Sequence, residues 1–301
     1  MEFDLIALIK SKTTIDSSVQ VGIGDDAAVI NNSQNTQLVV STDTLVEGVH
    51  FDQRATARQI GHKSLAVNLS DLAAMAAQPK WVTLNISLPT IDMEWIELFI
   101  TGFLQLADKH QVNLVGGDTT TGPLSITVTV FGEVEKNQYL LRSGAKRNDL
   151  IAVTGEIGSA AYALKHPNTA LDIFLHVPEP QLKISQQIKT FAHSCIDISD
   201  GLMADLGHIC SQSKLSAKIS LQQIPVNPLI KNHDPLWSEL VLAGGDDYQL
   251  CFTFSADDLD KLPAGCTVIG QMGCGLGVKV FSNNQQMDFK QKGFVHFNNI
   301  N

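Results

Sequence analysis

The sequence lacks the features of nucleic-acid-coating, membrane-spanning and secreted proteins. Lysine and arginine number 21 against 31 aspartates and glutamates in 301 residues, so the formal net charge is −10. This balance argues against a surface that coats nucleic acid. No apolar run is long enough to cross a bilayer, and the start, Met1-Glu2-Phe3-Asp4, is acidic where a signal peptide would be basic. We therefore expect a cytoplasmic protein with neither a membrane nor a nucleic-acid partner.

The five cysteines form no C-x-x-C pair. An odd number without that spacing argues against a disulfide framework and against a zinc knuckle. We interpret them as buried free thiols in a reducing compartment.

Familiar catalytic signatures are missing too. The sequence contains no G-x-x-x-x-G-K-[ST] phosphate loop, no H-E-x-x-H zinc motif, no G-x-S-x-G nucleophile elbow and no H-R-D kinase loop. No side chain therefore stands out as a nucleophile or a general base, and we expect none.

What the sequence does contain is carboxylates beside glycine or another small residue, at six places. An unpaired buried carboxylate is costly, and such clusters are tolerated mainly where a cation neutralises them. The pattern predicts several divalent ions and a polyanionic ligand. The six segments are Gly24-Asp25-Asp26, Ser41-Thr42-Asp43, Asn68-Leu69-Ser70-Asp71, Gly116-Gly117-Asp118, Asp197-Ile198-Ser199-Asp200 and Gly244-Gly245-Asp246-Asp247.

Hydrophobic spacing predicts strands and helices in both halves of the chain. The first half has predicted strands at residues 37–41, 81–88, 112–115 and 124–134, and predicted helices at 56–77 and 92–110, the latter capped by Asp92. The second half has predicted strands at 150–154, before Asp197, and at 248–254, 267–271 and 278–281, with helices at 157–165, 181–191 and 199–211. The polar, basic stretch 142–149 predicts a domain junction, giving domains 1–148 and 149–301.

Several acidic residues fall where a ligand would bind. Asp43 ends a predicted strand and Asp118 follows one, which predicts carboxylates at the rim of a sheet, although either could be an ordinary turn aspartate. Asp71 lies in the predicted helix 56–77 one turn after Asn68, and we favour an inward carboxylate over an exposed polar edge. Ser199 or Asp200 could cap the next predicted helix, whose N-terminus would also favour phosphate.

Taken together, these segments resemble the thiamine-monophosphate kinase family, closely and along most of the chain. The family belongs to a superfamily with aminoimidazole ribonucleotide synthetase and selenophosphate synthetase. The segments that carry the resemblance are Gly22-Ile23-Gly24-Asp25-Asp26, Ser41-Thr42-Asp43-Thr44, Leu65 to Met75, Gly116-Gly117-Asp118-Thr119-Thr120, Arg142-Ser143-Gly144-Ala145-Lys146, Ile196 to Leu202, and Gly244-Gly245-Asp246-Asp247-Tyr248.

The resemblance implies a two-domain α/β (α+β) fold of the aminoimidazole-ribonucleotide-synthetase type, whose N-terminal sheets pair in a homodimer. It implies ATP-dependent phosphorylation of thiamine monophosphate to thiamine diphosphate, with several Mg²⁺ ions and direct in-line transfer. Residues 1–148 would bind ATP and Mg²⁺ and form the dimer. The implied Mg²⁺ ligands are Asp26, Ser41, Thr42, Asp43, Asp71, Asp118, Asp197 and Asp200. The implied ATP contacts are Gly117, Asp118, Arg142 and Ser199, and the implied substrate contacts are His50, Asp246 and Phe294.

The chain departs from the family pattern at three places. Asp246 stands where glutamate is common, Phe294 stands where tyrosine or tryptophan is usual, and residues 176–183 lack the arginines of an Arg-Pro-x-Pro-Arg-like segment. Two alternatives to the kinase stay open. One is a superfamily enzyme with another phosphoacceptor, although selenophosphate synthetase has a reactive residue near its N-terminus and the first cysteine here is Cys195. The other is a non-catalytic acidic metal-binding protein, although no EF-hand spacing is present.

Overall fold

The chain forms two compact units in a computed structural model that describes residues 8–21, 29–287 and 289. One unit comprises Met1–Leu72 and Ala77–Asn137, and the other comprises Ala73–Ala76 and Gln138–Asn301. Within the described residues, none of the helices combines the length and the hydropathy that a bilayer crossing requires.

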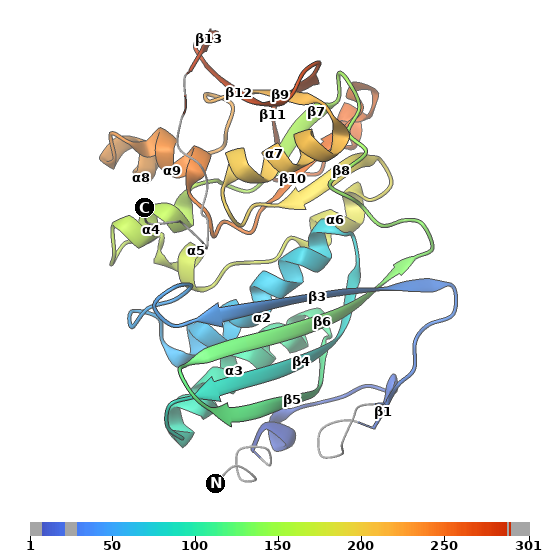
Figure 1. The fold of residues 1–301 in the computed structure, drawn as a ribbon, viewed down its shortest axis with the longest axis vertical. Helices are drawn as coiled ribbons and strands as arrows, with labels where there is room; N and C mark the ends of the chain where they lie inside the picture. The colour runs from blue at the N-terminus through green and yellow to red at the C-terminus, as the bar shows by residue number, and fades with distance from the viewer. Residues whose placement is uncertain (1–7, 22–28, 288, 290–301) are drawn as a thin grey trace. The chain divides into compact units, whose positions relative to one another are not determined.

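The first unit is built on a four-stranded sheet with the strand order β3-β6-β4-β5 (Figure 1). β6 pairs antiparallel with β3 and with β4, while β4 and β5 run parallel. Parallel neighbours need a crossover, and the second of two helices supplies it. The elements are β3 (Thr36–Val46), α2 (Ala57–Ala74), β4 (Gln78–Leu88), α3 (Met93–His110), β5 (Asn113–Thr121) and β6 (Ser125–Glu135), with a separate β1 (Val19–Val21) and β2 (Val29–Ile30) pair.

Both helices cover the same face of this sheet (Figure 1). The alternation along β6 explains why: Ile126, Val128 and Val130 are fully buried, and the threonines between them are only partly covered. α3 begins after Asp92, whose carboxylate accepts the N–H groups of Glu94 and Trp95, so the predicted cap is confirmed.

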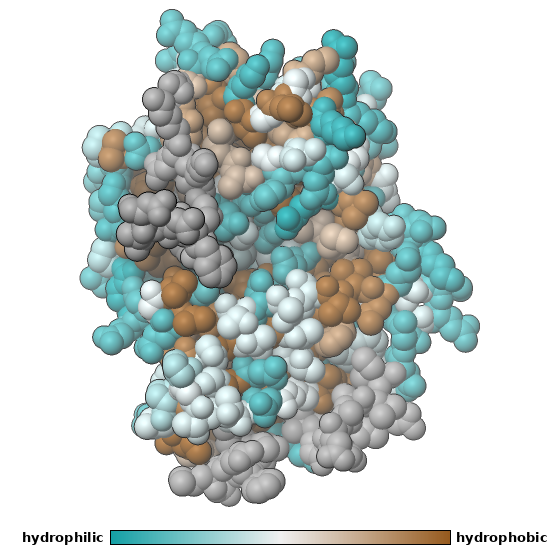
Figure 2. All heavy atoms as spheres, viewed as in Figure 1, coloured by the Kyte–Doolittle hydropathy of each residue, from teal (hydrophilic) through white to brown (hydrophobic). Residues whose placement is uncertain are grey.

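Among the described residues, no helix covers the opposite face of the four-stranded sheet, which carries paired threonines. The hydroxyls of Thr42 and Thr129 lie 3.0 Å apart, and those of Thr44 and Thr127 lie 2.8 Å apart, each pair directly opposite across β3 and β6. Such cross-strand pairs stabilise a sheet locally. Figure 2, drawn from the same direction, shows side chains of intermediate hydropathy over this face with apolar ones beside them. We call this surface the open face.

The second unit is built on a seven-stranded sheet with the order β13-β12-β9-β11-β7-β10-β8. Its core joins one face of the sheet to α4, α5, α7, α8 and α9, with Ile196, Leu206 and Ile269 among the fully buried residues. The strands are β7 (Leu150–Thr154), β8 (Ala192–Asp197), β9 (Ser216–Ser220), β10 (Leu250–Phe254), β11 (Cys266–Gly273), β12 (Gly277–Ser282) and β13 (Gln285–Gln286). The helices are α4 (Ser159–Lys165), α5 (Asp172–His176), α6 (Leu182–Ile188), α7 (Leu202–Ser213), α8 (Pro228–His233), α9 (Trp237–Ala243) and the 3₁₀ helix η1 (Ala256–Lys261).

The predicted mixed α/β class is confirmed, but two predicted strands are too short. The strand predicted at 37–41 extends to Val46, and the one predicted at 112–115 extends to Thr121. Asp43 and Asp118 therefore lie inside strands and not at or beyond their ends. The threonines around both aspartates favour extended backbone, and pairing with β6 and β4 overrides the two glycines before Asp118.

Candidate functional site

In the first unit, β3 and α2 bring two predicted metal ligands together. The Ser41 hydroxyl donates to the Asp71 carboxylate at 2.6 Å. Two residues further along β3, the backbone N–H of Asp43 donates to the side-chain oxygen of Asn68, one turn before Asp71 on α2, at 3.0 Å. Asn68 is fully buried and donates in turn to the Ser64 carbonyl. The Asp71 carboxylate thus faces β3, as the inward orientation predicted from the sequence requires.

Thr42 lies between these residues, and its side chain is on the other face of the sheet. Successive side chains of a strand alternate, and the Thr42 hydroxyl bonds with Thr129 and with the Val128 carbonyl on the open face. Ser41 and Asp43 face α2. A metal held by Ser41 and Asp43 can therefore take from Thr42 only its backbone carbonyl.

Asp118 is far from Asp43 within one chain. Asp43 is on β3 and Asp118 is on β5, the two edges of the sheet, so three strand spacings separate them. At about 4.8 Å per spacing the backbones are about 14 Å apart. The register also puts Asp118 in one row with Asn85, Thr127 and Thr44, which is the open face. Two ligands of one Mg²⁺ lie within about 4 Å of each other, so these two carboxylates of a single chain cannot share an ion.

His50 follows β3 and is fixed by the backbone on one side. Its Nδ1 accepts the N–H of Val46 at 2.9 Å, so that nitrogen carries no proton. The neutral ring then carries its proton on Nε2 and can act there as a donor. The buried Lys63 ammonium donates to the His50 carbonyl at 3.1 Å and fixes the same residue through its backbone.

In the second unit, β8 ends at Asp197, a predicted Mg²⁺ ligand, and the loop after it carries Ser199, a predicted ATP contact, and Asp200, another predicted Mg²⁺ ligand. The expectation that Ser199 or Asp200 caps the following helix is wrong. α7 begins at Leu202, and the carboxylate of Asp205, in its first turn, accepts the N–H groups of Ser199, Asp200 and Gly201 at 3.1 Å each. The three N–H groups that precede this helix are therefore directed at a side chain of the helix itself.

The Gly244–Tyr248 segment packs directly on that loop. The Asp246 N–H donates to the Ser199 carbonyl at 2.9 Å, and the Tyr248 N–H donates to the Ile198 carbonyl at 2.8 Å. A Cβ at Gly245 would overlap the Ser199 carbonyl, so this glycine is needed for backbone packing, a reason the sequence did not reveal. The Tyr248 hydroxyl donates to the Asp246 carboxylate at 2.7 Å and orients it.

Asp247 fastens the same segment to α4, and its titration gives a testable pH dependence. Its carboxylate accepts the Gly158 N–H at 2.8 Å, yet burial raises its pKa from 3.8 to about 7. The folded chain then binds more protons than the unfolded chain between these values, so the free energy of unfolding falls as the pH rises. From roughly pH 5.5 to roughly pH 8 this group alone accounts for a loss of about 2 kcal/mol.

We expect Asp247→Asn to remove that contribution. Urea unfolding of both proteins at the two pH values measures it, because titrations common to both proteins cancel in the comparison. The substituted protein should lose less stability than the unaltered one as the pH rises. Equal losses would contradict the assignment of this titration to Asp247.

Arg142, a predicted ATP contact, is an exposed residue of the second unit. A series of polar contacts begins four residues later, at Lys146. The Lys146 ammonium lies 3.0 Å from Nε2 of His193, whose Nδ1 lies 2.9 Å from the buried Asp149 carboxylate. Asp149 also accepts the Lys146 N–H at 2.7 Å. The basic stretch 142–149, which the sequence predicts to be a domain junction, is thus held to β8 by the carboxylate of Asp149.

Asp26 and Phe294 lie outside the described residues. Among residues 8–21, 29–287 and 289, no three histidine, cysteine, aspartate or glutamate side chains are grouped so that they could hold one metal. Lys63, Asp205 and Tyr248 were not predicted to be site residues, because each acts through a neighbour. The place of Asp205 in the first turn of α7 was a usable signal.

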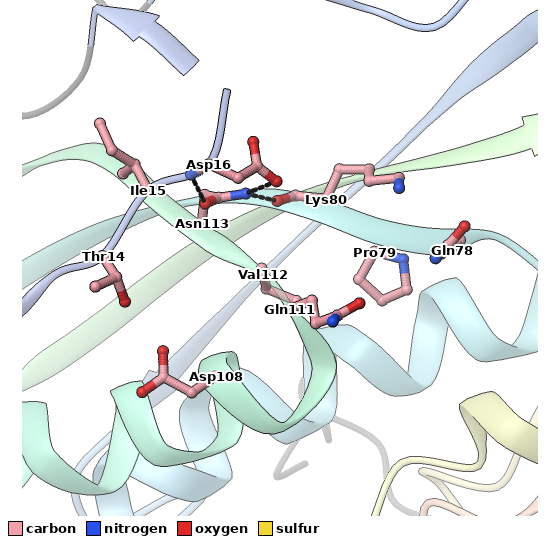
Figure 3. Close-up of a pocket in the computed structure, with 10 residues that line it drawn as sticks. All are labelled: Thr14, Ile15, Asp16, Gln78, Pro79, Lys80, Asp108, Gln111, Val112 and Asn113. Carbon is pink, nitrogen blue, oxygen red and sulfur yellow. Dashed lines mark hydrogen bonds between the residues drawn. The ribbon is translucent and has the colours of Figure 1, made fainter. Parts of the chain in front are cut away.

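A pocket of about 380 Å³ lies elsewhere in the first unit (Figure 3). It opens where β4 and β5 begin, and Asn113 there bonds with Asp16 and with the Lys80 carbonyl. Asp118 is five residues further along β5, about 17 Å away. This pocket is therefore separate from Asp118.

Comparisons with known proteins agree with the fold and the motifs. Residues 24–134 match the family described as AIR synthase related protein, N-terminal domain. A thiamine-monophosphate kinase from Haemophilus influenzae is 42% identical over 296 residues, covering 91% of this chain and 90% of the relative. The crystal structure of thiamine-monophosphate kinase from Stenotrophomonas maltophilia K279a superimposes with a TM-score of 0.84 at 41% identity, covering 92% of this chain and 94% of that one. A structure described as AaThiL complexed with AMPPCP and TMP superimposes with a TM-score of 0.79 at 29% identity, covering 98% and 97%.

These findings define the class first: a mixed α/β protein with an N-terminal domain of the AIR synthase type. Within that class the chain belongs to the thiamine-monophosphate kinase family.

Proposed function

We propose that this chain transfers the γ-phosphoryl group of ATP to the phosphate of thiamine monophosphate, giving thiamine diphosphate and ADP. The observation that carries the proposal is the likeness, over 98% of the chain, to a structure that holds AMPPCP and TMP. The acceptor oxygen is already anionic, so no base is needed to remove a proton. The lack of a recognisable nucleophile or base in the sequence agrees with this chemistry.

The donor atoms suit magnesium. Ser41, Asp43 and Asp71 offer hydroxyl and carboxylate oxygens, which Mg²⁺ prefers to nitrogen or sulfur. Bound Mg²⁺ would offset the repulsion between the two phosphate groups. The proposed ligands, for several ions, are Asp26, Ser41, Asp43, Asp71, Asp118, Asp197, Asp200 and the carbonyl of Thr42.

The remaining side chains bind and orient the two substrates. Gly117, Asp118, Arg142 and Ser199 are the proposed ATP contacts. His50 would donate from Nε2 to thiamine monophosphate, beside Asp246 and Phe294. Transfer is direct and in line, so catalysis consists of positioning and charge stabilisation without a covalent phosphoenzyme. A radiolabelled enzyme after incubation with γ-labelled ATP alone would contradict this.

We also propose that two chains pair through the open face with edge strand β3 of one chain beside edge strand β5 of the other, so that Asp118 reaches the Asp43 site of the partner copy around that edge. The separation of about 14 Å between Asp43 and Asp118 in one chain supports this arrangement. So does the exposure of Leu38 and Val40 on the same face, at 46% and 51%. A two-fold pair repeats one surface and exchanges Asp118 reciprocally. Sedimentation equilibrium should give twice the chain mass of 32.6 kDa, and a monomer would contradict the pairing.

A coupled assay for ADP release tests the proposed reaction. We expect turnover with thiamine monophosphate and Mg²⁺, and none with free thiamine or with aminoimidazole precursors. Calorimetric titration with AMPPCP, with and without Mg²⁺, separates an enzyme from a metal-binding protein that ignores nucleotides. Turnover with free thiamine and none with the monophosphate would overturn the choice of acceptor.

A further inference from the structure

Asp205 is a buried carboxylate that belongs to none of the predicted ligand sets. It lies in the first turn of α7 and is 3% exposed. One of its oxygens, Oδ2, accepts three consecutive N–H groups, those of Ser199, Asp200 and Gly201, each at 3.1 Å. Three adjacent N–H groups that point at one position form a concave anion site. Here a carboxyl group of the protein fills that site.

The loop held in this way is fixed on its carbonyl side as well. The Ser199 carbonyl accepts the Asp246 N–H, and the Ile198 carbonyl accepts the N–H of Tyr248. The Ser199 backbone is held through both its N–H and its carbonyl and has little freedom to turn, and the Asp200 backbone is held through its N–H. Their side chains are only half-buried and are the groups left to meet a ligand.

We propose that Asp205 is a positioning residue that holds Ser199 and Asp200 in the orientation needed to bind magnesium and nucleotide. It touches no substrate in this role and acts through the three N–H groups. The inference rests on the proposed function for what Ser199 and Asp200 bind. It adds a residue that sets the geometry of the nucleotide half of the site, as outer partners of metal ligands do.

Asp205→Asn is the direct test, because it removes the charge while keeping the size. The amide oxygen can still accept these N–H groups but is neutral and a weaker acceptor than a carboxylate, and the amide NH2 finds no acceptor among them, so the loop is held less firmly. We expect the dissociation constant for AMPPCP in the presence of Mg²⁺ to rise about 10- to 100-fold. The Mg²⁺ concentration for half-maximal turnover should rise similarly, and KM for thiamine monophosphate should change much less. Asp205→Glu, which restores the charge, should recover part of the nucleotide affinity.

Asp234→Asn is the matched control. Asp234 is 2% exposed and also accepts a backbone N–H, that of Leu236, together with the side chains of Lys165 and His166. Its substitution should lower the thermal midpoint without changing AMPPCP binding. Two results would overturn the positioning role alone. One is an unchanged AMPPCP affinity in Asp205→Asn. The other is an equal loss of AMPPCP affinity in Asp205→Asn and Asp234→Asn when both variants lose the same thermal stability. Failure of the unaltered chain to bind AMPPCP with Mg²⁺ would overturn the proposed function and the inference with it.

Discussion

Asp43→Asn and Asp118→Asn are each expected to lower turnover by about 100-fold or more while the fold survives. Both changes replace a carboxylate that the proposed mechanism uses as a metal ligand, and loss of a ligand should exceed the 10- to 100-fold effect of losing an outer partner. The ADP-release assay measures the rate, and circular dichroism with thermal unfolding checks the fold. Asp258→Asn, which removes a surface pair with Lys261, is the control and should leave turnover unchanged.

Mixing the two inactive variants should restore activity. If Asp43 of one chain and Asp118 of its partner complete one site, a mixed dimer has one intact site and one site that lacks both carboxylates. Half of the dimers are mixed after random exchange of subunits, so about one quarter of the unaltered activity should return. No recovery, with exchange verified by differently tagged chains, would contradict the shared site. Near-normal rates in either single variant would remove that aspartate from the metal set.

Gly117→Ala is expected to destabilise the first unit by about 2–3 kcal/mol, because its new Cβ would overlap the backbone carbonyl of Leu84 on β4. Gly116→Ala is the matched control, one residue away, with nothing within 4 Å of the added atom. That change should leave the free energy of unfolding unchanged or raise it by up to about 1 kcal/mol. Urea unfolding measures both.

The comparison of these two variants distinguishes two explanations for Gly117: close packing of strands β4 and β5, and contact with ATP. Equal stability of the two variants would show that close packing of β4 and β5 is not what requires Gly117. Contact with ATP would then be the remaining explanation for Gly117. The predicted difference instead assigns Gly117 to strand packing, with any nucleotide contact made by its backbone.

Local features of this fold could be predicted from the sequence because their causes are local. The cap at Asp92, the long alternating strand that became β6 and the inward face of α2 at Asn68 and Asp71 each follow from residues within a few positions of one another. The resemblance supplied the candidate site residues in the same way, one motif at a time.

The arrangement of those motifs in space could not be predicted, because strand order and register depend on contacts between distant segments. Nothing in the sequence indicated that β3 and β5 would be the two edges of one sheet, and this separates Asp43 from Asp118. Likewise, Asp205 resembles any acidic residue in a first helical turn until the loop before it is seen to bend its N–H groups toward that carboxylate. The distance between Asp43 and Asp118 in one chain is the reason for proposing a site that two chains share.

The most direct test of this account is a crystal structure of the chain with Mn²⁺ in place of Mg²⁺, AMPPCP and thiamine monophosphate, because anomalous scattering locates the metal independently. The account predicts metal peaks about 2.1 Å from oxygens of Asp43 and Asp71, with Asp118 of the second copy completing the shell. Peaks coordinated by water and phosphate alone, with these carboxylates apart from any metal, would contradict it.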